Sequence, residues 1–495
     1  MSVLPVALIA LLAGLLSLAL RPRRRSSVVA GLIGLAIVAV AATTIRPGDS
    51  IAVGGESIIG SAFVRLFVEL GAVAALLLAT VGVTARAPRS IPGIALIGLG
   101  TSALALASPN PDIAVATLAA GSIVSVIAVA GPNAPARVTI AARALRAVVV
   151  SALLAMLAVA WGDSGAAFST ALGPQGGAGG GPILGLAYLA AVGAVALRAG
   201  AIPTNAWALR LADIAPMVAN PIVMAWGPAA LAVVLLTWTQ STVGAFGAPL
   251  AIERTAVIVA GAASIILGAV AAHLHDDVEH IVGYSIVQDA GVVLLAFGTL
   301  DPTAQPNART WILAYVVVKS AFGAWAAAVS SIFGTRRLSE LRGWARRAPL
   351  HAVALMLIAA GSIGLPGLAA FDARVRLIGL TLDWPLDLFV YVGAIGAIGY
   401  YVRILLIGIG PPSPHILSGA TPWPRWPRAV RGASPRRIVG KVPAALRMNR
   451  APIGAVVVLA LAILGVVTAA GGLGVPGAAF EPPFAGGGGP GPGVP

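Results

Sequence analysis

The sequence has 495 residues, of which 58% are hydrophobic and only 10% charged, and its mean hydropathy is +0.96. Soluble domains carry roughly a quarter charged residues, so the composition excludes a soluble globular protein and indicates a membrane protein. The net charge is +15 and the sequence has no Cys, which excludes disulfides, iron–sulfur ligation and thiolate zinc sites.

In chain order, apolar stretches recur that are long enough to cross ~30 Å of hydrocarbon. The first has no basic residues before it and is followed by RPRRR, so we predict a retained helix rather than a cleaved signal peptide. The predicted spans are 2–20, 28–45, 57–83, 91–107, 112–130, 138–161, 183–199, 216–239, 254–273, 279–299, 307–333, 349–364, a broken stretch at 367–409, and 450–473.

These spans place almost every Arg cluster on one side of the membrane. Arg-rich loops favour the cytoplasmic side, so we interpret the basic charge as a topology signal rather than as a nucleic-acid site. The sequence therefore predicts a multi-pass protein of the cytoplasmic (inner) membrane with its N-terminus outside. The loops predicted on the cytoplasmic side are 21–27, 84–90, 131–137, 200–215, 334–348 and 410–449.

Two stretches predict interrupted helices. Residues 200–228 contain four prolines, and residues 364–376 read GLPGLAAFDARVR. Irregular backbone at membrane depth is tolerated only where it contacts protein or a water-filled cavity. Transporters use such breaks in corresponding positions of two related halves, so we expect the same arrangement here.

Five motifs give this sequence a resemblance to a known family. The segments are NAWALRLADIAP from Asn205, DVEHIVGYSIVQDAG from Asp277, YVVVKSAFGAWAAAV from Tyr315, LRGWARRAP from Leu341 and GSIGLPGLAAFDARVRLI from Gly361. In order and spacing they resemble the antiporter-like membrane subunits of respiratory complex I. Relatives of that family occur in membrane-bound hydrogenases, Mrp-type cation/proton antiporters and inorganic-carbon uptake systems. The resemblance covers about 183 to 409, whereas the first 180 residues match only in helix layout.

The resemblance implies an all-α polytopic membrane protein with about 14 transmembrane helices, in two inverted antiporter-like repeats with two broken helices. The expected divisions are N-terminal helices at 1–110, a degenerate first half at 111–274, a second half at 275–409, a basic cytoplasmic loop at 410–449, a last helix at 450–473 and a disordered Gly/Pro tail at 474–495.

Members of this family transfer protons or cations along a mid-membrane row of ionisable residues. Lys suits this role because burial lowers the pKa of an ammonium group toward neutrality. The family's first-half pair is a Glu near Ala119 to Gly121 and a Lys near Ala229. Both are missing from this sequence.

In the second half, the resemblance assigns five candidate residues for proton or ion transfer. Glu279 stands at the family's Lys position and Asp289 at its His position, while Lys319 occupies a second His position. Arg374 stands where the family carries a terminal Lys or Glu, and Asp372 precedes it. Asp289 is the expected partner of Lys319 by depth, with Asp372 as the alternative.

Some acids have a structural alternative. Asp276 and Asp277 precede a predicted helix, where carboxylates stabilise the helix dipole, and Glu279 could serve either role. Arg374 cannot release its proton, so it could hold an anion or gate a path but could not relay protons by deprotonation.

The sequence predicts a membrane subunit of a complex I-like proton-translocating oxidoreductase that is itself non-catalytic. The alternative is a non-pumping scaffold subunit of a hydrogenase, Mrp-type antiporter or inorganic-carbon uptake complex. A membrane glycosyltransferase that uses the Asp276–Asp277 pair is less favoured. Expected partners are other membrane subunits and the lipid bilayer. We expect no nucleic acid, no metal and no cofactor, and quinone contact stays open, as do the identity of the complex and of the ion.

Overall fold

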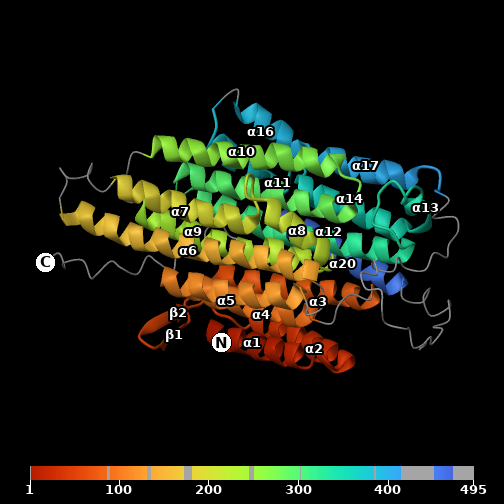
Figure 1. Cartoon of the computed structure of the whole chain (residues 1–495), viewed down its shortest axis with the longest axis horizontal. Helices are drawn as coiled ribbons and strands as arrows, with labels where there is room; N and C mark the ends of the chain where they lie inside the picture. Colours follow the sequence, from red (N-terminus) through yellow and green to blue (C-terminus); the bar gives the residue numbers. More distant parts are fainter. Residues whose placement is uncertain are drawn as a thin grey trace.

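The computed structural model describes residues 2–85, 90–130, 135–171, 181–244, 250–301, 303–383, 386–413 and 451–471. Most helices run side by side along one axis (Figure 1). The described strands form one hairpin, β1 (Ser50–Val53) and β2 (Glu56–Ile59), whose two-residue turn is Gly54–Gly55. Both glycines have positive φ, of 62° and 91°, which the primed turns of tight hairpins require.

All other regular elements in the described ranges are helical. They are α1 (Val3–Ala19), α2 (Arg24–Ala42), α3 (Ala62–Thr84), α4 (Ile91–Ala107), α5 (Pro111–Ala130), α6 (Pro135–Ala171), α7 (Gly181–Ala199), α8 (Ala206–Ile214), the π-helix η1 (Ile222–Trp226), α9 (Gly227–Thr242), α10 (Ala251–Leu274), α11 (Val278–Thr299), α12 (Ala304–Phe333), α13 (Trp344–Arg347), α14 (Pro349–Ile363), α15 (Ala369–Gly379), α16 (Leu386–Ile395), α17 (Ala397–Ile409) and α20 (Ala451–Ala469).

Within the described residues, 11 helices are long and apolar enough to span a membrane, and α1, α4 and α14 are shorter apolar helices. The predicted all-α polytopic membrane fold is confirmed. The predicted loop 200–215 is wrong in part, because it contains the helix α8. Most of the expected basic loop at 410–449 and the whole expected tail at 474–495 lie outside the described residues.

Burial separates central helices from peripheral ones. The membrane-spanning window of α12 is 100% buried and that of α11 94% buried, whereas those of α2, α6 and α10 are 33–39% buried. A helix that is apolar all round belongs in the interior, whereas a peripheral helix presents apolar side chains to its surroundings. Leu12 on α1 and Val40 on α2, for example, are 66% and 70% exposed. Any polar group on α11 or α12 must therefore find its partner inside the protein.

Both predicted helix breaks are present. The chain leaves α7 at Gly200 and α14 at Gly364, with φ of +66° and +61°. Only glycine adopts this conformation at little cost, because it has no Cβ. At the first break, Trp207 Nε1 donates to Leu197 O at 2.7 Å and Thr204 Oγ1 donates to Ala196 O at 3.0 Å. Side chains thus satisfy carbonyls that the end of α7 leaves free.

The loops between helices bring one end of the molecule together. Val278 N donates to Arg336 O at 3.0 Å, and Leu338 N donates to Asp276 O at 2.6 Å. Gly343 N also donates to Ile407 O at 3.0 Å. The α10–α11 connection, the α12–α13 connection and the end of α17 therefore share one face, which we call the α13 face. The β hairpin lies at the opposite end of the helices (Figure 1).

The positive φ of Gly364 at the second break leads to a prediction about stability. We expect Gly364→Ala to lower the free energy of unfolding by about 1–2 kcal/mol, because Ala strains the left-handed conformation. A Cβ there would also meet Phe371 N at 3.2 Å. Thermal denaturation of the purified protein measures the change. The control is Gly193→Ala, where a Cβ would meet only Leu154 Cδ1 at 3.8 Å. Equal melting temperatures for the two variants would contradict the prediction.

Candidate functional site

The centre of the molecule contains a buried ion pair between α11 and α12. Lys319 Nζ lies 2.9 Å from Asp289 Oδ2, and the two side chains are 0% and 6% exposed. Asp289 is the twelfth of the 22 residues of α11, and Lys319 is the sixteenth of the 30 residues of α12. Both groups therefore stand near the middle of their helices, at mid-membrane depth. The structure thus shows the pairing of Lys319 with Asp289 that the sequence predicts from their similar depth along the helices.

Neighbouring helices complete the surroundings of this pair. Lys319 Nζ donates a hydrogen bond of 2.9 Å to Ser362 Oγ, which stands at the end of α14 just before the second break. Tyr401 on α17 also interacts electrostatically with Lys319. An ammonium group has three N–H donors, so the carboxylate and these oxygens together can satisfy it.

Arg374 is the second cation near Asp289. Its side chain is 4% exposed, and its charge interacts with that of Asp289. The guanidinium carbon lies 5.6 Å from the centre of the Trp311 ring, and Trp311 Nε1 donates to Asp289 O at 3.2 Å. Arg374 Nε has no hydrogen-bond partner among the described residues. The guanidinium is thus packed on an aromatic ring, facing a carboxylate that already has a closer cation.

Asp372 lies elsewhere. It is exposed, and it forms no ion pair with any described residue. The reason is helix geometry, because residues two apart on a helix do not share a side, and α15 turns Arg374 inward. The alternative pairing of Asp372 with Lys319 is therefore wrong, and the proposed place of Asp372 in ion transfer stays a prediction.

A second polar group lies beside the pair. Gln288, which precedes Asp289, donates from Nε2 to Gly393 O at 3.1 Å and accepts from Tyr400 OH at 3.3 Å. The rings of Tyr400 and Tyr401 are 4.6 Å apart. These contacts fix the junction of α16 and α17 against α11. The sequence analysis did not select Gln288, although a Gln in a predicted span is itself a signal.

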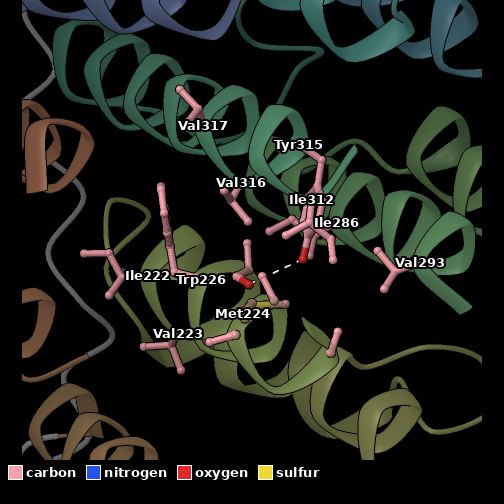
Figure 2. Close-up of a cluster of buried hydrophobic side chains, with 14 of the residues drawn as sticks. Ile222, Val223, Met224, Trp226, Ile286, Val293, Ile312, Tyr315, Val316 and Val317 are labelled. Atoms are coloured by element: carbon pink, nitrogen blue, oxygen red, sulfur yellow. Dashed lines mark hydrogen bonds between the residues drawn. The ribbon is translucent and has the colours of Figure 1, made fainter. Parts of the chain in front are cut away.

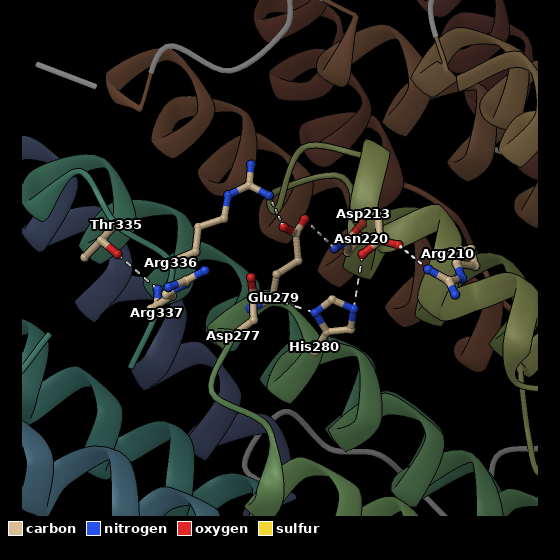
Figure 3. Close-up of polar contacts among 9 residues, drawn as sticks. All are labelled: Arg210, Asp213, Asn220, Asp277, Glu279, His280, Thr335, Arg336 and Arg337. Atoms are coloured by element: carbon tan, nitrogen blue, oxygen red, sulfur yellow. Dashed lines mark hydrogen bonds and ion pairs between the residues drawn. The ribbon is translucent and has the colours of Figure 1, made fainter. Parts of the chain in front are cut away.

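Glu279 lies at the α13 face, near the start of α11. It is 2% exposed and forms an ion pair with Arg336, and Asn220 Nδ2 donates to its Oε1 at 3.4 Å. Figure 3 shows this group with the neighbouring His280, whose Nε2 lies 3.1 Å from Asp213 Oδ1. Glu279 is therefore a buried, paired carboxylate rather than an exposed helix cap.

The two preceding acids have structural roles. Asp277 is the N-cap of α11 and accepts from Glu279 N at 2.8 Å, which confirms the predicted helix start. Burial alone would raise the pKa of Asp277, but His280 and the Glu279 N–H outweigh it and hold that pKa below its usual value. Asp276 accepts from Ser339 N at 2.9 Å and from Ser339 Oγ at 2.7 Å. These contacts join α11 to the 334–348 segment.

Apolar side chains separate the two charged groups from each other and from the first half. Asp289 lies ten residues after Glu279 on α11, which is about 15 Å by helix rise. Val282 and Ile286, both buried, lie between them. Figure 2 shows the apolar cluster, which includes Ile222, Val223, Trp226, Ile286 and Val316. Two labelled side chains donate hydrogen bonds there: Tyr315 OH donates to Ala225 O at 3.4 Å, and Trp226 Nε1 donates to Ser320 Oγ at 3.0 Å.

The first half contains a buried cation that sequence reasoning missed. Arg198, near the end of α7, is 4% exposed. Its Nη2 donates to Ser122 Oγ at 2.9 Å, next to the position where the family's Glu was expected. Arg198 lies inside the predicted span 183–199, but it was not among the candidate residues. A predicted helix break at that point was the available signal that it lies inside the membrane.

Comparison with known proteins identifies the family. Residues 145–399 match the transmembrane family of the NADH:quinone oxidoreductase/Mrp antiporter proteins. This match covers more than half of the chain, so the chain belongs to that family, as the motifs predicted. The predicted resemblance to the antiporter-like membrane family is thereby confirmed.

Individual relatives are distant. NADH-quinone oxidoreductase subunit N of Halorhodospira halophila is 24% identical over 242 residues, which is 48% of this chain and 49% of that protein. Subunit N 1 of Streptomyces griseus is 27% identical over 247 residues, which is 49% of this chain and 51% of that protein. The matched region thus spans about half the length of each of these curated relatives.

Solved structures show the same fold over nearly the whole chain. A chain of respiratory complex I from Thermus thermophilus with bound aureothin has a TM-score of 0.64 at 22% identity, covering 94% of this chain and 98% of that one. A chain of the Mrp complex from Dietzia sp. has a TM-score of 0.70 at 18% identity. The match covers 99% of this chain and 54% of that one. At these identities the likeness shows the fold alone.

The central ion pair makes a testable prediction about stability. We expect Lys319→Met to lower the free energy of unfolding by about 3–5 kcal/mol, because it leaves the Asp289 carboxylate buried without its cation. The double variant Lys319→Met/Asp289→Asn should recover most of that loss. Thermal or denaturant unfolding in detergent measures both. If the double variant is as unstable as the sum of the two single variants, the charges are not coupled.

Proposed function

We propose that this chain is a proton-transferring membrane subunit of a multisubunit, complex I-like redox assembly. The observation that carries the proposal is Lys319, a fully buried ammonium paired with a buried carboxylate at mid-membrane depth. Ionisable groups are costly inside the membrane, and they mark ion and proton pathways when they face the protein interior. Membership of the antiporter-like family supports the same function.

The chemistry follows from the pair. When Lys319 passes its proton to Asp289, both groups become neutral together, so the net charge of the pair does not change. Ser362 Oγ accepts a hydrogen bond from Lys319 Nζ and holds the amine in position in either state. Arg374 keeps its proton, and its charge favours the ionised form of Asp289. In this proposal Lys319 and Asp289 exchange the proton, and Arg374 sets the balance between them.

Glu279 is the proposed contact point between this site and the α13 face. It is buried beside His280, Asp213 and Arg336, where water-exposed groups meet the interior. The apolar residues between Glu279 and Asp289 require water to enter before a proton can cross. We propose that the α13 face is cytoplasmic, because Arg-rich loops favour that side.

The flux experiment uses the chain in its native assembly, reconstituted into vesicles with a pH-sensitive dye inside. We expect Lys319→Ala to reduce proton flux by at least tenfold relative to the parent, because Ala has no exchangeable proton. Arg25→Ala is the matched control, since Arg25 is exposed at the start of α2 and should leave the flux unchanged. Unchanged flux in Lys319→Ala would remove Lys319 from the mechanism.

A second candidate function is a non-pumping scaffold subunit. The specific observation in its favour is the first half, where Arg198 occupies the place expected for the family's acid–base pair and cannot release its proton. Unchanged flux in Lys319→Ala, with the assembly intact, would favour the scaffold.

Membership of an assembly is tested separately. We expect the tagged chain, extracted in mild detergent, to co-purify with other membrane subunits. The physical reason is the apolar surface of its peripheral helices, which is available for protein partners as well as lipid. Native mass spectrometry of the extract identifies the partners. A chain recovered only as a monomer would contradict the proposed assembly.

A further inference from the structure

A small cavity lies in the first half, between α3, α4, α5, α7 and η1. Its volume is about 30 Å³, which exceeds the space that one water molecule needs, roughly 10–15 Å³. The wall is mostly apolar, and its polar side chains are Thr101, Ser102, Ser122, Ser125 and Arg198.

Arg198 gives the cavity a fixed positive charge. Its protein partners are Val223 O at 3.3 Å, Ser122 Oγ at 2.9 Å and the Trp207 ring, whose centre is 5.9 Å from the guanidinium carbon. No carboxylate in the described part of the chain forms an ion pair with it. A guanidinium keeps its proton, and a buried charge without a counter-charge is costly. The cavity therefore favours an anion beside Arg198.

Two hydroxyl groups are free to donate into the same space. Ser122 Oγ accepts from Arg198, so its own proton can point elsewhere. Ser102 is 3% exposed, lines the cavity, and forms no side-chain hydrogen bond with any residue in the described ranges. Thr101 and Ser125 instead donate to Ile97 O and Gly121 O, at 2.9 and 2.8 Å. The Arg198 guanidinium and the hydroxyl groups of Ser122 and Ser102 can together coordinate an anion. The charge of Arg198 would repel a cation in the same cavity.

We propose that this cavity binds one monovalent anion of halide size, held by Arg198, Ser122 and Ser102. The polar lining offers one guanidinium and two free hydroxyl groups, which suits a small anion of single charge. The site lies between Ser122 on α5 and Gly227 at the start of α9, where a Cβ would meet Arg198 Nη2 at 3.1 Å. A fixed cation with an exchangeable anion thus replaces the acid–base pair expected in the first half.

This site is separate from the proposed proton site. Val223 and Trp226 line the cavity. They also belong to the apolar cluster that includes Val316 of α12 (Figure 2). On the far side of Trp226, its Nε1 donates to Ser320 Oγ at 3.0 Å, one residue after Lys319. The inference goes beyond the proposed function, because anion binding needs no proton flux.

The experiment measures halide-dependent stability of the purified full chain, or of its assembly if it co-purifies. Sodium chloride and sodium bromide are titrated against sodium gluconate at constant ionic strength. For the parent, we expect the melting temperature to rise with halide concentration and to saturate, because a ligand that binds only the folded state stabilises it by mass action. A crystal soaked in bromide should show an anomalous peak beside Arg198.

Variants separate a specific site from a general salt effect. Arg198→Met should abolish the halide response, whereas Arg210→Met, on an exposed side chain, should keep it. Gly98→Val retains Arg198 and fills the cavity, since a Cβ at Gly98 would meet nothing within 4 Å. It should lose the response, and Ser102→Ala should shift the saturation midpoint several-fold higher.

Three results would overturn the proposal. They are equal melting temperatures of the parent in halide and gluconate, an equal halide response in parent and Gly98→Val, and no bromide peak in the cavity. Because Ser102→Ala and Gly98→Val leave the buried charge in place, the test holds even if Arg198→Met does not fold. None of these readouts depends on proton flux, so failure here and failure of the proposed function are distinguishable.

Discussion

The structure depends on one constraint, which is that α12, whose membrane-spanning window is fully buried, carries an ammonium group. An isolated charge there would be too costly to keep, so the surrounding helices must supply a carboxylate and further oxygens. Asp289 comes from α11 and Ser362 from the end of α14. The packing of α11, α12, α14 and α15 around this pair is therefore tied to the electrostatics of a single side chain.

The helix breaks make that packing feasible. Because α14 stops at Gly364, Ser362 stands at a helix end inside the membrane, and α15 can restart at an angle that turns Arg374 toward Asp289. The break between α7 and α8 does the same in the first half, where Arg198 stands close to the end of α7. The two halves thus use the same backbone device to deliver different chemistry. One brings Ser362 and Arg374 to the Lys319–Asp289 pair, and the other brings Arg198 to Ser122.

The α13 face links the second half to its surroundings. Asp276 and Asp277 organise the start of α11 and the 334–348 segment, and Arg336 from that segment reaches back to Glu279. Backbone hydrogen bonds between the α10–α11 and α12–α13 connections reinforce this arrangement. A buried carboxylate, a histidine and an exposed guanidinium meet where the interior gives way to the surface, while Val282 and Ile286 keep them apart from the central pair.

The sequence by itself determined the membrane class, the helical spans and the mid-membrane depth of Asp289 and Lys319. Backbone groups in a bilayer must be satisfied within each helix, so length and hydropathy specify the spans, and the constant rise per residue gives the depth. Beyond the Asp289–Lys319 pair, only the tertiary structure decided which groups meet. It paired Glu279 with Arg336, turned Asp372 outward, and placed Arg198 against Ser122 in a cavity. Lipid and protein interior are equally apolar, so hydropathy does not encode which side of a helix packs on which neighbour.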